Sequence, residues 1–560
     1  MPDSEFKIPF DASLYPVREL RAGNLTCLYE NGNLRRIKKG QTEILRMIYA
    51  AVRNEHWDTA SYSIENENIE QSEKSFRITY TAVYRYLSVV YQADILMEGK
   101  EDHSIAFTMS GKAVRAFQRN RIGLCVLHPV KECRGIPVTI NHGAGKNDQR
   151  SFSNTISPHQ LFTEIRQMDW TTRNNIKVTL FFEGDLFETE DQRNWMDESY
   201  KTYGTPLTLP IPVSIHPGER IQQGVILKVT VPDPDLPVGL IPSISGKGKK
   251  VPFPKIGFAR NGSSCQLSPE EIIILRKLPF EQYRVEIYFG NAHWKEQLLK
   301  YISEARQLET KLELILFFTS SFESEMMDLL AQLKGKDRYI ASILPLYDGY
   351  QVTPDFLSEY GYPILKKTFP AIEIGYGTDG HFTELNRQRP AGESFDFVSF
   401  SCHPQVHAKD TRTLMENLAA LPDIIETIRS FTEKPLVVSP VSFTKRKKPD
   451  AANMGVPEEP ADIRQTQWFG AAWTLLCLYF LHGADRISFY QTNGEHGIPD
   501  NGTGGPIYKV LSALKMFRPV WMQLENDEAP RKIIFENGQN QKLIFPLAPE
   551  YGNINSGNNI

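Results

Sequence analysis

From residue 256 to residue 516 the sequence alternates strictly between short apolar segments and longer amphipathic segments. The short segments are rich in β-branched and aromatic residues, as buried strands are, and the longer ones repeat their apolar residues at the helical period. Eight strands with helical connections in about 260 residues predict a (β/α)8 barrel, because that fold needs about 250 residues. The strands are expected at residues 256–259, 284–289, 312–318, 340–346, 372–376, 395–400, 436–440 and 486–490.

An open doubly wound sheet is the alternative, because it is built from the same alternation of strand and helix. The nucleotide-binding versions of that fold place a glycine-rich loop directly after the first strand. Here the first strand leads into Arg260-Asn261-Gly262, and neither a GxGxxG nor a Walker sequence follows it. The sequence therefore favours the barrel.

The first 245 residues have a different pattern, in which short segments rich in Val, Ile, Tyr, Phe and Thr recur between turn residues. Several of these segments alternate apolar and polar residues, which predicts strands with one buried face. Two short stretches, 43–51 and 112–117, are expected to be helical. So many strands with so few helices predict a large antiparallel β-sandwich.

A stretch dense in Pro, Gly and Ser at residues 232–254 is typical of a linker. The sequence is therefore divided into a β-sandwich domain at 1–245, a catalytic TIM-barrel domain at 250–519 and a C-terminal β module at 520–560. The last begins at a return to β character and contains a predicted hairpin. We predict a multidomain α+β chain whose short C-terminal module is incomplete or unusually small.

Charge and composition exclude several classes of function. The chain has 63 Lys and Arg against 67 Asp and Glu, a formal net charge of −4, which argues against nucleic acid or an anionic membrane as the main partner. The longest apolar run, 468–481, is too short to span a bilayer. The start of the chain lacks a basic segment followed by an apolar one, and the six cysteines form no CxxC motif. We expect a cytoplasmic protein with reduced thiols, with an exported protein whose signal peptide has been removed as the alternative.

Polar residues gather where several barrel strands are expected to end, which is where barrel enzymes carry their catalytic groups. Carboxylates beside imidazoles suit general acid–base hydrolysis, in which one group deprotonates water and another protonates the leaving oxygen. The richest exits are those of strands five, six and eight. The candidates are Asp379, His381, Glu384 and Asn386 after strand five, His403 after strand six, Asn493, Glu495 and His496 after strand eight, and Arg260 and Lys445 after strands one and seven.

A metal site is a separate possibility at these exits. His381, His403 and His496 with Glu384 would make four ligands, but no HxH or HExxH pair fixes two of them on one element. We therefore assign no metal ligands and expect no cofactor, while leaving a divalent metal open. Cys402 is a weaker candidate for a nucleophile, because a thiol beside a barrel strand is usually a small buried hydrophobe.

The sandwich contains a second cluster, at residues 182–198, where seven carboxylates are interleaved with Arg193 and Trp195. Carboxylates such as Glu188 can bind sugar hydroxyls while an aromatic ring stacks on the apolar face of a sugar. The same residues equally suit a domain–domain interface held by ion pairs of Arg193. Both interpretations stay open at this point, and we count Glu188, Arg193 and Trp195 among the candidate substrate-binding residues.

Four segments of the chain resemble the D-apionate lactonase family. The longest runs from Phe182-Glu183-Gly184-Asp185 to Arg193-Asn194-Trp195 and continues into Lys201-Thr202-Tyr203. The others are Cys125-Val126-Leu127-His128-Pro129, Ile156-Ser157-Pro158-His159-Gln160 and, in the barrel, Asp462-Ile463-Arg464-Gln465. The resemblance covers most of the chain, from the sandwich through the barrel.

The resemblance implies a β-sandwich, a TIM barrel and a C-terminal β module, and a bacterial carboxylic-ester hydrolase of carbohydrate metabolism. Its implied reaction is the hydrolysis of D-apionolactone to D-apionate in the catabolism of D-apiose. From strand-end position alone we expect Glu384 as the general base, with Glu495 as the alternative base. His403 or His496 is expected to be the acid, and Asn493, Arg260 or Lys445 to contact the oxyanion or the hydroxyls.

A TIM-barrel glycoside hydrolase acting on plant-derived oligosaccharides is the alternative function, with Glu384 and Glu495 as its two carboxylates. Retaining barrel glycosidases usually carry their nucleophile at the exit of strand seven. Here that exit, residues 442–448, contains no Glu, which counts against a glycoside hydrolase. A non-catalytic binding or scaffold protein would leave the strand-end clusters unexplained. The sequence leaves the stereochemistry of the lactone and the oligomeric state open.

Overall fold

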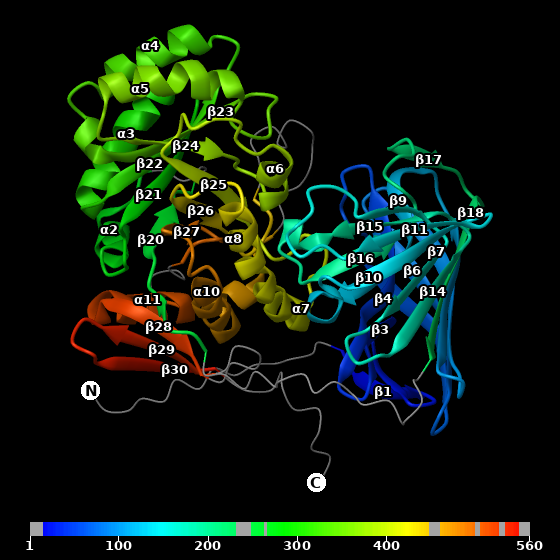
Figure 1. Ribbon diagram of the computed structural model, residues 1–560. Helices are drawn as coiled ribbons and strands as arrows, with labels where there is room; N and C mark the ends of the chain where they lie inside the picture. Colours follow the sequence, from blue (N-terminus) through cyan, green and yellow to red (C-terminus); the bar gives the residue numbers. More distant parts are fainter. Residues whose placement is uncertain are drawn as a thin grey trace. The chain divides into compact units, whose positions relative to one another are not determined.

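The computed structural model describes residues 15–230, 248–261, 266–446, 460–498, 504–525 and 532–547. The chain divides into two compact units. One unit contains Ser13–Arg193 and Glu198–Ser243, and it holds the N-terminal strands. The other contains Ile244–Ile560 together with the short segment Asn194–Asp197, and it holds the barrel (Figure 1).

The N-terminal unit is a sandwich of two antiparallel sheets, as predicted. The first sheet has the order β1-β2-β3-β4-β9-β16-β15-β12, and β17 also pairs with β9. The second has the order β11-β10-β13-β14-β18-β8-β7-β6-β5. The strands of the first sheet are β1 (Val17–Ala22), β2 (Leu25–Glu30), β3 (Asn33–Lys39), β4 (Thr42–Asn54), β9 (Phe117–Pro129), β12 (Phe162–Ile165), β15 (Phe187–Asp191), β16 (Ser199–Tyr203) and β17 (Val213–Ile215), and those of the second are β5 (Tyr62–Gln71), β6 (Phe76–Tyr86), β7 (Val89–Gly99), β8 (Ser104–Ala113), β10 (Pro137–Gly143), β11 (Lys146–Ser151), β13 (Gln167–Thr171), β14 (Lys177–Glu183) and β18 (Arg220–Thr230), with the one-turn helix α1 (Val130–Cys133) after β9.

The core of the sandwich lies between the two sheets and follows the two-residue period of its strands. In β7, Tyr91, Ala93, Ile95 and Met97 are buried, and the residues between them are not. Removing each such side chain from water contributes roughly 1.5–3 kcal/mol, so this alternation fixes which face of the strand turns inward.

The expectation of a helix at 43–51 is wrong, because these residues belong to the long strand β4. β4 pairs with β3 on one side and with β9 on the other, so it is a central strand. Ile44, Leu45 and Ile48 are all buried, and this spacing resembles that of a helix face. The expected helix at 112–117 is also wrong, since β8 ends at Ala113 and β9 begins at Phe117.

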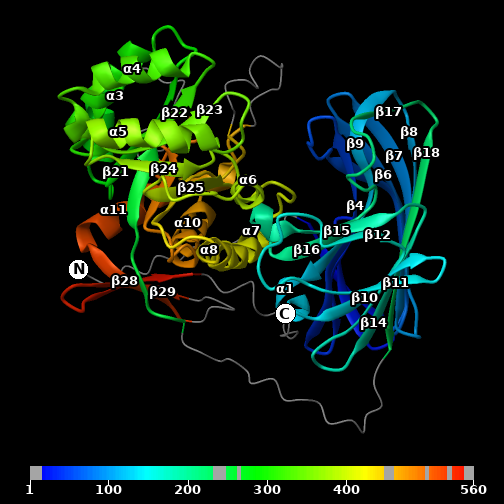
Figure 2. The ribbon, with the colours of Figure 1, turned by 45° about the horizontal axis from the view of Figure 1, so that its top comes forward.

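The central part of the chain forms a closed barrel of eight parallel strands, β20 to β27, which confirms the predicted barrel and excludes the open sheet. Helices α3, α4 and α5 lie together outside its strands (Figures 1 and 2). Each predicted strand overlaps an observed one. The strands are β20 (Lys255–Ala259), β21 (Gln282–Tyr288), β22 (Lys311–Phe318), β23 (Ile340–Tyr347), β24 (Glu373–Gly377), β25 (Phe397–Cys402), β26 (Leu436–Val441) and β27 (Arg486–Gln491), and the helical segments are α2 (Pro269–Leu275), α3 (Trp294–Leu308), α4 (Phe322–Leu333), η2 (Asp337–Tyr339), η3 (Leu357–Gly361), α5 (Tyr362–Thr368), α6 (Phe382–Arg387), α7 (Thr411–Glu416), η4 (Asn417–Ala420), α8 (Leu421–Arg429), η5 (Ile463–Thr466), α10 (Trp468–Phe480) and α11 (Pro506–Phe517).

Polar side chains join three of the strands inside the barrel. Gln282 Nε2 donates to Glu313 Oε2 at 3.1 Å and to Ser488 Oγ at 2.8 Å, and Ser488 Oγ donates to Glu313 Oε2 at 3.0 Å. Gly257 leaves room for this network, because a Cβ at its position would lie 2.3 Å from Gln282 Cγ. The network gives hydrogen-bond partners to the Gln282 amide and the Ser488 hydroxyl, which would be costly to bury without them.

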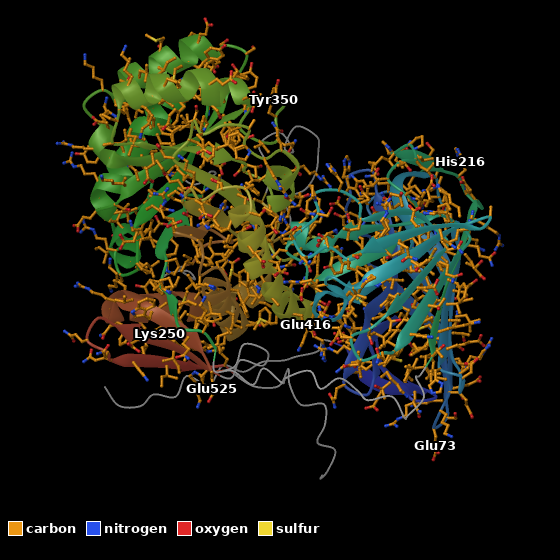
Figure 3. All side chains as sticks on the ribbon, in the orientation of Figure 1. Glu73, His216, Lys250, Tyr350, Glu416 and Glu525 are labelled. Carbon is orange, nitrogen blue, oxygen red and sulfur yellow. The ribbon has the colours of Figure 1, made fainter. Side chains whose placement is uncertain are left out.

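A small C-terminal sheet has the order β19-β28-β29-β30, with β19 (Val251–Pro252), β28 (Pro519–Leu524), β29 (Lys532–Asn537) and β30 (Lys542–Pro546). The predicted hairpin is confirmed as β29 and β30. β19 precedes the barrel and pairs with β28, which follows it. Lys250, which is labelled in Figure 3 and lies next to β19, forms an ion pair with Glu536 at 2.6 Å. Most of the expected linker at 232–254 lies outside the described residues, and the C-terminal tail from Tyr551 lies outside them entirely.

Candidate active site

The exit of strand five is held in place by the neighbouring strand. Ser401, near the end of β25, donates its hydroxyl to the carbonyl oxygens of Asp379 at 2.8 Å and Gly380 at 3.0 Å. β24 passes so close to β25 that a Cβ at Gly377 would lie 2.0 Å from the carbonyl oxygen of Ser399. The loop that carries Asp379 and His381 is therefore fixed by contacts with a barrel strand.

Two of the predicted histidines lie against each other at the exits of strands five and six. The ring centroids of His381 and His403 are 4.5 Å apart, in an edge-to-face arrangement. His403 Nδ1 is buried and has no hydrogen-bond partner among the described residues. Burial, with the nearby His381, Lys445, Arg446 and Lys409, holds the pKa of His403 well below its usual value. The imidazole of His403 is therefore neutral at pH 7.

The short segment Asn194–Asp197, which belongs to the same compact unit as the barrel, contacts this histidine pair through Trp195. The ring of Trp195 lies 5.6 Å from that of His381 and 6.1 Å from that of His407. Asp197 Oδ1 accepts a hydrogen bond from Asn417 Nδ2 at 2.5 Å, and Asp197 Oδ2 pairs with His407 Nδ1. Trp195 was a predicted binding residue, whereas His407 and Asp197 were missed.

Asn386 and Glu384 both lie on α6, directly after His381. Asn386 Nδ2 donates to Asn194 Oδ1 at 2.9 Å, so Asn386 anchors the segment that carries Trp195. Glu384 is half-buried, and a Cβ at Gly380 would lie 3.2 Å from its Cγ. In the part of the chain that the structure describes, its carboxylate makes no hydrogen bond or ion pair.

Asp379 belongs to a buried cluster of charges that the sequence interpretation largely missed. Asp379 Oδ1 pairs with both Arg284 and Arg446. Arg446 Nη1 also donates to Glu286 Oε1 at 2.7 Å, and Tyr288 OH donates to Glu286 Oε2 at 2.7 Å. The two arginines hold the pKa of Glu286 well below its usual value despite burial, so its carboxylate is ionised.

A sequence signal for this cluster existed. Strands of parallel barrels are usually continuous apolar runs, whereas β21 places Gln282, Arg284, Glu286 and Tyr288 at alternate positions. Alternating polar residues within one barrel strand indicate side chains that point into the barrel interior.

The candidates at the exit of strand eight form their hydrogen bonds with residues other than the histidine pair. His496 Nδ1 is 3.2 Å from Thr444 Oγ1, and Gln465 Nε2 donates to the carbonyl oxygen of His496 at 2.9 Å. Asn493 Nδ2 donates to Glu271 Oε1 at 2.9 Å, and Glu495 is exposed. Within the described ranges no hydrogen bond, ion pair or ring contact joins these residues to His381 or His403.

Arg260 and Lys445 have contrasting surroundings. Arg260 is buried, and its Nε donates to Glu304 Oε2 at 2.8 Å and its Nη2 to Glu304 Oε1 at 3.3 Å. Its guanidinium also lies 4.6 Å from the ring centroid of Tyr301. Lys445 is exposed, and its charge contributes to the low pKa of His403. Lys445 is therefore one of the cations, with Arg446 and Lys409, whose charge acts on His403.

Two further predicted binding residues, Glu188 and Arg193, belong to the N-terminal unit and are buried there. Arg193 Nη2 pairs with Asp191 Oδ2 at 2.7 Å and donates to the carbonyl oxygen of Ser153 at 3.2 Å. Glu188 Oε1 accepts from Tyr203 OH at 2.6 Å. Arg193 therefore holds the sandwich together locally, next to the segment that carries Trp195.

The described residues show no arrangement for a metal ion and no reactive thiol at Cys402. Among the described residues, no group of three or more His, Cys, Asp or Glu side chains is arranged to hold a metal ion. Burial raises the pKa of the Cys402 thiol to about 12, so it is a poor nucleophile near pH 7. Within the same part of the chain, every helix is too short or too polar to cross a lipid bilayer.

The chain contains an antiparallel sandwich and a TIM barrel, and the barrel carries imidazoles and carboxylates at its strand exits. These features define the class of barrel proteins that carry acid–base groups where barrel enzymes place their active sites. Its residues 8–232 match the family model of the D-apionate lactonase N-terminal domain, and residues 256–519 match that of the D-apionate lactonase TIM barrel domain. The chain belongs to the D-apionate lactonase family.

A curated relative, the D-apionate lactonase of Brucella anthropi, is 29% identical over 469 residues, which are 78% of this chain and 75% of the relative. Among solved structures, a family 51 α-L-arabinofuranosidase from Bifidobacterium longum covers 55% of this chain and 84% of its own, at 10% identity and a TM-score of 0.38. An endo-1,4-β-D-mannanase from Thermotoga petrophila covers 47% of this chain and 99% of its own chain, at 13% identity and a TM-score of 0.32. Structural likeness this low carries no argument about function.

Proposed function

We propose that this protein is a lactonase that hydrolyses D-apionolactone to D-apionate in the catabolism of D-apiose. The observation that carries the proposal is the pair of imidazoles, His381 and His403, at two adjacent barrel strand exits in a chain of this family. Opening a lactone requires a base for water, stabilisation of an oxyanion and a proton for the departing ring oxygen.

His403 supplies both proton transfers in this proposal. Because its imidazole is neutral at pH 7, it accepts a proton from water while the water oxygen bonds to the lactone carbonyl carbon. The imidazolium then returns that proton to the ring oxygen as the carbon–oxygen bond breaks, so the net change is the addition of one water. Glu384, with its uncommitted carboxylate, is the alternative base. The low pKa of His403 replaces our expectation that it begins the reaction as an acid.

Lys445 is the proposed contact for the oxyanion. Of the three cationic or amide candidates, Arg260 is held by Glu304 and Asn493 donates to Glu271, whereas the charge of Lys445 reaches His403. An ammonium beside a developing negative charge stabilises the tetrahedral intermediate more than the uncharged substrate.

Trp195 is the proposed platform for the sugar ring. Its indole lies against His381 and is held near the barrel exits by the Asn386–Asn194 hydrogen bond. An aromatic ring stacks on the apolar face of a sugar, which would orient the lactone carbonyl for attack. We also propose a cytoplasmic location, which suits the buried free thiols of the five described cysteines.

The test incubates the full chain with D-apionolactone and with aryl glycosides, and follows acid release and aglycone release separately. We expect acid release only. His403→Ala should lower kcat/KM by roughly 10²–10⁴-fold, the usual contribution of a general base. His293→Ala, which removes an exposed histidine from another strand exit, is the matched control and should change little.

Two further variants decide between the candidate bases. If His403→Ala retained near-full activity while Glu384→Gln lost it, Glu384 would be the base. If both variants and Glu495→Gln retained near-full activity, the proposed site would be wrong. Release of aglycone without acid from the lactone would instead indicate a glycoside hydrolase.

A further inference from the structure

We propose that Glu286 and Arg446 form the floor of the barrel mouth and bind two neighbouring hydroxyl groups of the substrate. This inference rests on the proposed function and deepens it, because it states which part of a sugar lactone the two residues recognise. Neither residue takes part in the proton transfers assigned to His403. Their role is to set which lactone the enzyme prefers.

Arg446 lies near the axis of the barrel, beyond the C-terminal end of its strands. Arg446 follows β26, and its guanidinium pairs with Glu286 on β21 and with Asp379, which follows β24. In the closed barrel, β21 is three strands from β26 in one direction and β24 is two strands from it in the other. A guanidinium held from both directions lies over the middle of the barrel. Barrel enzymes carry their active sites at this end.

Solvent reaches this ion pair from the mouth of the barrel. The side chains of Glu286 and Arg446 are 26% and 22% exposed, so neither is sealed inside. Arg284 precedes Glu286 by two residues on β21 and therefore turns to the same side of the strand, but its side chain is only 2% exposed. Exposure decreases with depth, and the Glu286–Arg446 pair lies where the interior opens.

Both residues keep hydrogen-bonding capacity after their contacts within the protein. Arg446 uses one Nη1 hydrogen for Glu286 Oε1 at 2.7 Å, and its Nη2 group donates to the side chain of Asp379 and, at 3.1 Å, to the carbonyl oxygen of that residue. In the described part of the chain no group accepts from its Nε or from its second Nη1 hydrogen. Glu286 Oε2 accepts there only from Tyr288 OH, at 2.7 Å, and a carboxylate oxygen can accept two hydrogen bonds. The pair therefore offers both donors and an acceptor to a ligand.

Glu286 is fixed in position before a ligand arrives. Arg284 and Arg446 both donate to its Oε1, and Tyr288 donates to its Oε2. The ring of Tyr288 is itself stacked on that of Phe317, with centroids 4.3 Å apart and an interplanar angle of 7°. A site whose side chains are already ordered binds its ligand without the entropic cost of ordering them.

Donors and an acceptor on one rigid ion pair fit a vicinal diol. One hydroxyl donates to Glu286 Oε2, and the neighbouring hydroxyl accepts from Arg446. A sugar lactone carries such hydroxyls on its ring, whereas a plain lactone of the same ring size has none. Arg446 is close enough for its charge to act on His403, so a ring bound at this floor lies beside the proposed base.

Two five-membered lactones test the proposal on the full chain: D-erythronolactone, which carries a vicinal diol, and γ-butyrolactone, which carries no hydroxyl. We expect the wild type to show a kcat/KM at least about 100-fold higher for D-erythronolactone, because a site built for hydroxyls rejects a substrate that lacks them. Glu286→Gln should lower this ratio at least about tenfold, chiefly by raising KM for the diol. Comparing the ratio between proteins cancels the intrinsic reactivity of the two lactones.

Arg446→Lys is a second variant, since it keeps the positive charge beside Glu286 and Asp379 but loses the forked donors. It should also lower the ratio. Glu98→Gln, which removes another arginine-paired carboxylate from the second sheet of the sandwich, is the matched control and should leave the ratio unchanged. A merely structural role would lower both rates together, so an unchanged ratio in Glu286→Gln and Arg446→Lys would overturn the proposal. A wild-type ratio near one would do the same.

A diol without a lactone carbonyl separates this site from the proposed lactonase activity. 1,4-Anhydroerythritol, a five-membered ring with a vicinal diol, should bind the full chain in isothermal titration calorimetry. Glu286→Gln should raise its Kd at least about tenfold, the effect of one hydrogen bond to a charged group. If the wild type hydrolysed no lactone but bound this diol through Glu286, the diol site would stand and the proposed function would fail. If it hydrolysed D-apionolactone, and Glu286→Gln changed neither the ratio nor this Kd, the reverse would hold.

Discussion

At the scale of single residues, surroundings rather than residue type separate the candidates. Arg260 and Lys445 are both cations at strand exits, but the first is buried in an ion pair with Glu304 and the second is exposed near His403. The sequence alone predicted which strand ends carry polar groups, because turn residues mark those ends. Which groups were already paired depended on distant partners, such as Arg284 with Asp379, and no local pattern reveals them.

The low pKa of His403 gives a prediction about pH. In the free enzyme the acid limb of kcat/KM reports protonation of the base, so activity should persist well below pH 6.5. Lys445→Ala removes one of the positive charges that lower this pKa, so the limb should move to higher pH, in addition to any loss of rate. A kcat/KM–pH profile measures both. Lys515→Ala, on an exposed face of α11, should leave the limb in place, and an unmoved limb in Lys445→Ala would contradict the electrostatic argument.

His128 predicts acid sensitivity of the fold rather than of catalysis. It lies in the sandwich core, bonded to Thr202 at 2.8 Å, and burial lowers its pKa from 6.5 to about 3. The unfolded chain therefore binds a proton below pH 6.5 that the folded chain binds only near pH 3. This contribution to the free energy of unfolding is complete above pH 6.5 and decreases by about 3 kcal/mol between pH 7 and pH 4.

His128→Gln, which keeps a polar group beside Thr202, should flatten this pH dependence in chemical denaturation. The exposed His216 offers the control, His216→Gln, whose unfolding curve should follow the wild type at every pH (Figure 3). A His128→Gln protein that lost stability with acid as steeply as the wild type would contradict the assignment.

At the scale of elements, the barrel strands were predictable because each is short, apolar and bounded by turn residues. β4 was not, because a central strand buried on both faces loses the alternation that distinguishes a strand from a helix. The helical connection between β25 and β26 divides into α7, η4 and α8. Pro422 lies in the first turn of α8, a position where proline is common. It does not predict the short 3-10 helix η4 that separates α7 from α8.

Gly257 in β20 tests how tightly the polar network inside the barrel is packed. Gly257→Ala would place a Cβ 2.3 Å from Gln282 Cγ and 2.6 Å from the backbone oxygen of the same residue. We expect a loss of about 1–3 kcal/mol, seen as a lower Tm, because a backbone atom must move. Gly392→Ala, which meets no atom within 4 Å, is the control. Equal Tm values for both variants would mean that Gln282 can move away from the added Cβ at little cost in stability.

At the scale of the whole molecule, the four residues Asn194–Asp197, which lie between sandwich strands in the sequence, belong to the compact unit of the barrel. This arrangement explains why the long acidic motif suggested both a sugar site and an interface. Arg193 of this motif forms an ion pair with Asp191 inside the sandwich, and Trp195 packs against the ring of His381. Sequence patterns describe neighbours along the chain, so they could not divide one continuous motif between two units.

Trp195→Ala tests whether this segment serves catalysis. We expect KM for D-apionolactone to rise by roughly three- to tenfold, the loss of one aromatic contact, with a smaller change in kcat. Trp521→Ala, in the C-terminal sheet and 39% exposed, should leave both constants unchanged. An unchanged KM in Trp195→Ala would remove the stacking platform from the proposed site.

The pairing of β19 with β28 also bears on how the barrel can be moved between proteins. Val251 and Met522 are direct partners in the C-terminal sheet, so the chain begins and finishes the barrel at neighbouring backbone positions. Adjacent strands lie about 5 Å apart, a gap that the two arms of a surface loop span without distortion. The β19–β28 pairing therefore brings the entry into the barrel and the exit from it together in one small sheet.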